Sequence, residues 1–172
     1  MTMHKPSWDE YYLTIAYVVA QRSIDPSSKC GCVIVSKDNR ILSTGYNGPI
    51  KHSKDSKIPL ERPKKYYHML HAEENALLAY NGSYQDIEKA TAYVTGRPCH
   101  KCLRMLLQKG ITKIIHSINN TKVVDKDDIE AQELMLADRD IVIIEHNNEP
   151  FKALLNQTLE YIDIKSKQEK NY

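Results

Sequence analysis

The chain has 172 residues, of which 41% are apolar, which is enough for one domain with a hydrophobic core but short for two. Its 24 Lys and Arg residues nearly balance 22 Asp and Glu residues, so the sequence lacks the excess of positive charge of a nucleic-acid-binding protein, while a small anionic ligand is compatible with it. No apolar run reaches the roughly 18 residues of a membrane span, and residues 1–10 lack the apolar stretch of a signal peptide, so we expect a soluble cytoplasmic protein.

Hydrophobic periodicity and turn residues divide the chain into alternating helices and strands. In chain order we expect a helix at 8–19, strands at 30–35 and 41–46, a helix at 71–80, a strand at 91–95, a helix at 99–109, a strand at 112–117, a helix at 129–137, a strand at 141–145 and a final helix at 151–162. A special backbone turn is expected at Gly45-Tyr46-Asn47-Gly48-Pro49, and a polar, Lys-rich segment follows it.

This order of elements predicts the fold class. A hairpin followed by strands that alternate with helices is typical of an α/β domain whose sheet is covered on both faces. We therefore expect three α/β/α layers around a central mixed five-stranded sheet. The whole chain, residues 1–172, is predicted to be one domain, with a frayed polar tail from about residue 163.

The four cysteines form two close pairs, a spacing that in a reducing compartment indicates metal binding or buried thiols before disulfides. Cys99 and Cys102 lie three residues apart at the start of a predicted helix, so their sulfur atoms share one face and can bind one ion. Zinc binds thiolate and imidazole tetrahedrally, and three protein ligands leave its fourth position for water. With His71, which opens another helix, these residues predict a catalytic zinc site.

Glu73 follows His71 by two residues and is expected to border the same pocket. A carboxylate beside an activated water can take its proton and pass it on, which is general acid/base catalysis. The other cysteine pair, Cys30 and Cys32, alternates along a strand, and we expect both thiols to pack as small apolar groups rather than to bind metal.

The motifs His71-Ala72-Glu73 and Pro98-Cys99-His100-Lys101-Cys102 together resemble the zinc deaminase signature. The chain is similar to the cytidine and deoxycytidylate deaminase superfamily, and within it most of all to the deoxycytidylate deaminases, over about residues 11–145. Further matching segments are Ala20-Gln21-Arg22-Ser23, Asp25-Pro26, Gly31, Val33–Val35, Gly45-Tyr46-Asn47-Gly48 and His71–Ala76.

The resemblance implies a role for each motif residue. It implies that Zn²⁺ is bound by His71, Cys99 and Cys102, and that Glu73 is the proton shuttle. It also implies that Asn47 hydrogen-bonds the nucleotide. Further substrate contacts are expected from the segment that approaches the nucleotide in such enzymes, at Ser28, Lys29, Arg22 and Ser23.

The reaction implied by the resemblance is the hydrolysis of dCMP to dUMP and ammonia, without an organic cofactor. It also implies a homohexamer that is activated by dCTP and inhibited by dTTP, with Mg²⁺ accompanying a triphosphate effector. Two other functions stay open at this point: a base deaminase acting on tRNA or single-stranded nucleic acid, and a zinc-stabilised binding module without activity. The near-neutral charge and the Gly-Tyr-Asn-Gly segment argue against the first, and Glu73 with three zinc ligands argues against the second.

Overall fold

The computed structural model describes residues 5–118 and 125–169. Its α-helices are α1 (Trp8–Ala20), α2 (Ala72–Ala79), α3 (Tyr84–Ile87), α4 (His100–Gln108), α5 (Lys126–Leu136) and α6 (Glu149–Glu169), and two short 3-10 helices are η1 (Asp55–Lys57) and η2 (Lys64–Tyr67). Its strands are β1 (Gly31–Val35), β2 (Ile41–Tyr46), β3 (Gly48–Pro49), β4 (Met69–Leu70), β5 (Thr91–Val94), β6 (Lys113–Ser117) and β7 (Val142–His146).

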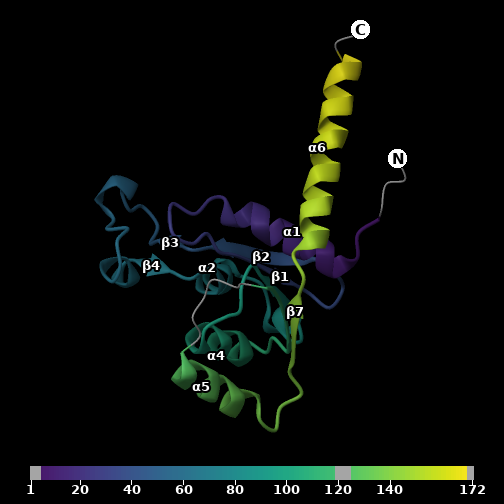
Figure 1. Cartoon of the computed structure of the whole chain (residues 1–172). Coiled ribbons are helices and arrows are strands. Elements are labelled where there is room, and N and C mark those ends of the chain that lie inside the picture. Colours follow the sequence, from purple (N-terminus) through teal and green to yellow (C-terminus); the bar gives the residue numbers. More distant parts are fainter. Residues whose placement is uncertain (1–4, 119–124, 170–172) are drawn as a thin grey trace.

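The central sheet has five strands in the order β2-β1-β5-β6-β7. β1 pairs antiparallel with both β2 and β5, whereas β5, β6 and β7 are parallel, so the sheet is mixed as expected. Helices lie on both sides of it, with α1 on one side and α2, α4 and α5 on the other (Figure 1). The predicted three-layer α/β/α class is confirmed.

Each face of the sheet carries its own hydrophobic core, because the side chains of a strand alternate between its two faces. On one face Cys32 and Ile34 of β1 pack with α2 and α4. On the other face Val33 and Val35 of the same strand pack with α1 and with Phe151 at the start of α6. All five side chains are at most 2% exposed, so β1 is a fully buried interior strand that packs against both layers.

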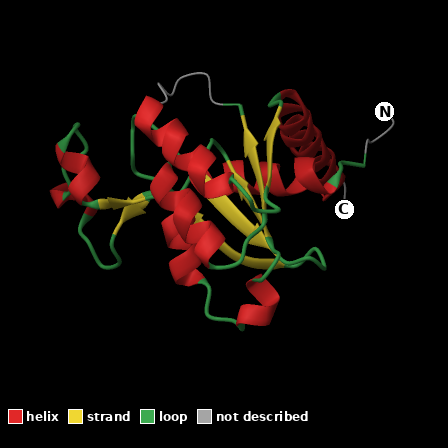
Figure 2. Cartoon of the chain, turned by 90° about the horizontal axis from the view of Figure 1, so that it is seen from below, coloured by secondary structure: helices red, strands yellow, loops and turns green. Residues whose placement is uncertain are grey.

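In place of the special backbone turn expected at 45–49, the chain makes a bend at Asn47, between β2 and β3. No φ angle in this fully described segment is positive, and Gly45 lies within β2. Gly48 and Pro49 then form β3, which pairs with β4 in a separate two-stranded sheet beside the main body (Figure 2). Gly45 instead lets α2 pack closely against β2, because a Cβ at residue 45 would overlap the backbone of Ala72 and Ala76 in α2.

The last helix is longer than expected. Residues 163–169 continue α6, where the sequence predicted a frayed polar tail, and residues 170–172 lie outside the described part of the chain. The segment 152–169 contains neither Gly nor Pro, so nothing in its sequence ends the helix. Figure 1 shows α6 projecting from the body. Every described helix is too short or too polar to cross a membrane.

Candidate active site

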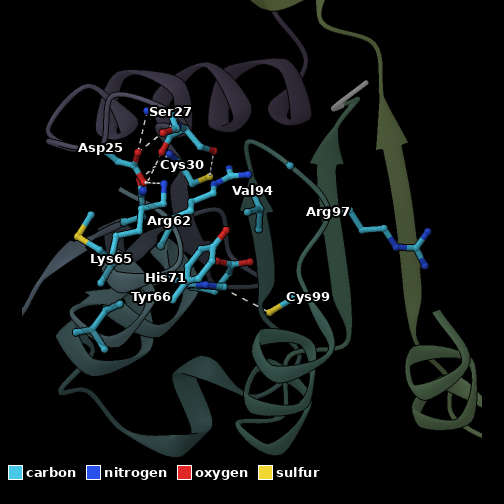
Figure 3. A pocket seen from close by; sticks show the side chains of 17 residues that line it. Asp25, Ser27, Cys30, Arg62, Lys65, Tyr66, His71, Val94, Arg97 and Cys99 are labelled. Carbon is cyan, nitrogen blue, oxygen red and sulfur yellow. Dashed lines mark hydrogen bonds and ion pairs between the residues drawn. The ribbon is translucent and has the colours of Figure 1, made fainter. Parts of the chain in front are cut away.

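A cavity of about 360 Å³ opens where the N-termini of α2 and α4 meet the loop before β1. Its lining residues are Asp25, Ser27, Ser28, Cys30, Asn47, Arg62, Lys65, Tyr66, Met69, Leu70, His71, Ala72, Glu73, Val94, Gly96, Arg97 and Cys99 (Figure 3). Polar and charged groups therefore surround a short apolar wall, which is typical of a site for a small polar ligand.

The three predicted metal ligands meet at one side of this cavity. His71 is the residue before the first turn of α2, and its backbone N–H donates to Glu74 Oε2 at 2.7 Å. Cys99 holds the same position before α4, and Cys102 lies one turn further on. His71 Nδ1 lies 3.6 Å from Cys99 Sγ and 3.3 Å from Cys102 Sγ, and the three donor atoms all lie within 4.8 Å of one another.

This geometry fits zinc. Tetrahedral coordination with ordinary zinc–sulfur and zinc–nitrogen bonds places a nitrogen and a sulfur ligand about 3.6 Å apart. The distance from His71 Nδ1 to Cys99 Sγ, 3.6 Å, equals that value, and the distance to Cys102 Sγ, 3.3 Å, is slightly shorter. His71, Cys99 and Cys102 are therefore arranged to hold one zinc ion.

Charge in the cluster also favours a cation. The hydrogen bond from Cys102 lowers the pKa of the Cys99 thiol to about 3, with a further contribution from His71. The same sulfur–sulfur hydrogen bond, together with burial, raises the pKa of Cys102. Cys99 is thus the thiol that ionises more readily, and a bound metal ion would stabilise both thiolates.

Glu73 lies beside this cluster without belonging to it. Its side chain lines the cavity and is 5% exposed, while the candidate metal-binding group comprises His71, Cys99 and Cys102. A hydrogen bond to Cys99 is the largest influence raising the pKa of His71; burial opposes it, and the charge of Glu73 adds to the rise. The Glu73 carboxyl group thus lines the same cavity as His71 and Cys99.

Two of the predicted substrate contacts, Asn47 and Ser28, line the cavity. The Asn47 side chain connects its own segment to the loop before β1: Oδ1 accepts from the Cys30 N–H at 2.7 Å, and Nδ2 donates to the Ser28 carbonyl oxygen at 2.8 Å. Asn47 thus fixes the shape of the cavity wall, and this arrangement leaves its second amide hydrogen and one lone pair of Oδ1 for a ligand.

The other three predicted contacts lie elsewhere. Ser23 is buried, and its Oγ accepts from the Asp25 N–H at 3.2 Å. Lys29 is exposed and donates to the Gln21 carbonyl oxygen at 3.4 Å. Arg22 lies over the Tyr46 ring, 6.0 Å from its centroid, and lines a second cavity. The structure therefore does not bring these three side chains into the candidate active site.

An ion pair that the sequence did not predict closes one side of the cavity. Lys65 Nζ lies 2.7 Å from Asp25 Oδ2, and the two side chains are 4% and 5% exposed. Burial acts to raise the pKa of Asp25, but the bonds from Lys65 and from the Ser27 and Ser28 N–H groups outweigh it and lower that pKa. Asp25-Pro26 signalled only a turn, and Lys65 stood among other lysines of a polar segment, so no local pattern indicated their pairing.

Both members of the second cysteine pair pack against the same core, as predicted. Cys32 is fully buried in the core, as expected. Cys30 precedes β1, is partly buried against the same core and also lines the cavity, so its thiol borders the candidate site.

Comparison with known proteins agrees with this geometry. Residues 6–118 match the family model described as the cytidine and deoxycytidylate deaminase zinc-binding region. The deoxycytidylate deaminase of Pongo abelii is 34% identical over 134 residues, which cover 74% of this chain and 73% of that protein.

Solved structures of deaminases are also similar to this chain. The dCMP deaminase of cyanophage S-TIM5, in complex with dCMP and dUMP, superposes with a TM-score of 0.66 at 26% identity, covering 84% of this chain and all of that one. A tRNA:A34 deaminase superposes with a TM-score of 0.51 at 14% identity, a likeness of fold alone. With a family model that matches residues 6–118, the chain belongs to the cytidine and deoxycytidylate deaminase family.

Proposed function

We propose that this protein is a zinc-dependent dCMP deaminase that converts dCMP and water to dUMP and ammonia. The observation that carries the proposal is one buried carboxylate, Glu73, placed in a cavity beside a His-Cys-Cys cluster of zinc-binding geometry. Relatives named deoxycytidylate deaminase, and the cyanophage enzyme in complex with dCMP and dUMP, support dCMP as the substrate.

His71, Cys99 and Cys102 would hold the zinc ion, which when bound supplies a Lewis acid that makes water nucleophilic near neutral pH. Glu73 takes a proton from the attacking water as its oxygen adds to C4 of cytosine, and delivers a proton to N3. It then takes the proton of the new C4 hydroxyl and passes it to the exocyclic amine, so that the C4 carbonyl forms, the C4–N bond breaks and ammonia leaves. Glu73 ends the cycle in its starting state.

The remaining cavity residues orient the nucleotide and exclude water. Met69, Leu70 and Val94 supply an apolar wall, whereas Ser28 and Asn47 supply polar atoms. A volume of about 360 Å³ lies within the usual range for a small-molecule site. This favours a free nucleotide over a polynucleotide, as does the net charge of +2.

Replacement of Glu73 tests the proposed division of labour. The variant Glu73→Gln keeps the size of the side chain but removes its basicity, so we expect one zinc per chain and a loss of dCMP turnover of about 100- to 10,000-fold. Zinc is measured by elemental analysis and turnover by ammonia release. Loss of zinc from Glu73→Gln, or turnover near that of the wild type, would contradict the roles assigned here.

Regulation and assembly form the finer part of the proposal. We propose a homohexamer that dCTP activates and dTTP inhibits, with Mg²⁺ bound to the triphosphate, in a cytoplasmic, reducing setting that suits four free cysteines. A second cavity of about 610 Å³, lined in part by Arg22 and Lys51, offers positive charge for an effector.

An effector must bind one state of the assembly more tightly than another to change its activity. We therefore expect sigmoidal dCMP kinetics that become closer to hyperbolic with dCTP, measured beside the mass in solution with and without Mg²⁺. Hyperbolic kinetics that neither triphosphate alters, from a monomeric protein, would refute the regulatory proposal while leaving the catalytic one intact.

A further inference from the structure

We propose that Arg62 binds the 5′-phosphate of the nucleotide and makes the site select nucleotides over nucleosides. This inference rests on the proposed dCMP deaminase function and adds a specificity-determining residue to it. The residue lies in the Lys-rich segment before α2, outside every motif that the sequence singled out.

Three positively charged side chains line the cavity, those of Arg62, Lys65 and Arg97. The Lys65 ammonium group is committed to Asp25 Oδ2 at 2.7 Å, and both side chains are buried. Arg97 Nε donates to Gln132 Oε1 at 3.1 Å, and Figure 3 shows this side chain pointing away from the cavity. Neither is free to meet a ligand charge.

Arg62 differs from both. Its side chain is exposed, and among the residues that the structure describes its guanidinium group has no hydrogen-bond or ion-pair partner. Figure 3 places Arg62 beside the loop of Asp25, Ser27 and Cys30, while His71 and Cys99 lie at the other side of the cavity. A nucleotide whose base meets the His-Cys-Cys cluster would therefore direct its phosphate toward Arg62.

Electrostatics make such a cation necessary. A phosphate monoester carries a charge of about −1.5 to −2 at pH 7. The cavity already holds the carboxylates of Asp25 and Glu73, and Lys65 neutralises only the first. The N–H groups of Ser27 and Ser28, which could otherwise bind phosphate, donate to Asp25 Oδ1 at 2.8 and 3.3 Å. Arg62 can bind two phosphate oxygens at once through its planar guanidinium.

The backbone also holds Arg62 in place. The Lys65 N–H donates to the Glu61 carbonyl oxygen at 3.0 Å, which closes a turn around residues 62–64. The buried pair between Lys65 and Asp25 then fastens this turn to the loop at Ser27 and Ser28. Arg62 is thus presented to the cavity by an anchored segment, although its own side chain is exposed.

Binding of the product separates phosphate recognition from chemistry. In zinc-loaded protein, titration calorimetry measures the dissociation constants of dUMP and deoxyuridine for the wild type, Arg62→Gln, Arg62→Lys and the control Lys64→Ala. Lys64 is a near neighbour outside the cavity, paired with Glu61 at 3.5 Å on the surface. Circular dichroism verifies the fold of each variant.

We expect Arg62→Gln to weaken dUMP binding about 10- to 100-fold, the loss expected for one charged hydrogen-bonding group, and to leave deoxyuridine binding unchanged. Arg62→Lys should bind dUMP with intermediate affinity, and Lys64→Ala should stay within about twofold of the wild type. Unchanged dUMP binding in Arg62→Gln, or equal weakening of dUMP and deoxyuridine, would overturn the inference. A wild type that neither deaminates dCMP nor binds dUMP would instead refute the proposed function.

Discussion

The buried ion pair between Lys65 and Asp25 gives the sharpest stability prediction. Replacing Lys65 by Met keeps the aliphatic stem but leaves the Asp25 carboxylate, at 5% exposure, without its cation. Breaking a buried pair in this way costs about 3–5 kcal/mol. Because the Ser27 and Ser28 N–H groups still bond Asp25 Oδ1, we expect the lower end, a loss of about 3 kcal/mol in the free energy of unfolding.

Urea unfolding followed by circular dichroism measures this loss, with all proteins zinc-loaded so that the contribution of the metal is the same. The matched control is Lys64→Met, whose ion pair with Glu61 has side chains 72% and 62% exposed and should cost under about 1 kcal/mol. The double variant Asp25→Asn/Lys65→Met should lose less stability than the two single variants added together. A loss below about 1 kcal/mol for Lys65→Met, or strict additivity, would refute this account of the pair.

Three further predictions concern acid stability, close packing and the second cysteine pair. Because the folded pKa of Asp25 is lowered, its stabilising contribution is present above pH about 4 and is lost as the pH falls through the folded pKa; the acid-induced decline in unfolding free energy should be shallower in Asp25→Asn. Gly45→Ala places a Cβ against the backbone of α2 and should destabilise the protein by about 1–3 kcal/mol in urea unfolding, and an unchanged midpoint would count against the packing argument. Cys32→Ala and Cys30→Ala should each retain one zinc by elemental analysis, with a stability loss of about 1 kcal/mol for the buried Cys32; loss of metal from either would show that it serves the zinc site.

The metal cluster could be predicted from the sequence because local rules determine most of it. Cys99 and Cys102 lie on one helical turn whatever the rest of the fold does, and His71 opens a helix whose start is visible in the sequence. Only the meeting of the two helix N-termini is non-local. The alternation of strands and helices predicted the α/β/α layers that bring these two N-termini together. The position of the metal cluster could therefore be predicted once the fold class was known.

The rest of the cavity could not be predicted in the same way. The strands β3 and β4 have two residues each, too few to show any alternation, and 19 residues separate Pro49 from Met69. Asp25 and Lys65 are 40 residues apart, and neither sits in a periodic pattern. Pairing at such distances is decided by tertiary packing, which is also why Lys29 and Arg22, close to Ser28 in sequence, lie outside the cavity.

Two expectations, one about a glycine and one about polar residues, differ from the structure for identifiable reasons. Gly45 looked like a turn residue, but its role is to let α2 approach β2, and sequence alone does not separate these two uses of glycine. Polarity suggested a frayed end beyond residue 163, whereas the helix-forming residues of that segment continue α6 to Glu169.

If the cavity deaminates a free pyrimidine deoxynucleotide, a comparison of kcat/KM across substrates should show it. The assay follows ammonia release from cytosine, cytidine, deoxycytidine, CMP, dCMP, dCTP and a tRNA anticodon stem-loop, using the wild type with Glu73→Gln as the inactive control. We expect kcat/KM to be highest for dCMP and to fall at least about 10-fold for deoxycytidine, which lacks the phosphate. A higher kcat/KM for the stem-loop or for deoxycytidine, or no release from any substrate by zinc-loaded wild type, would contradict the account.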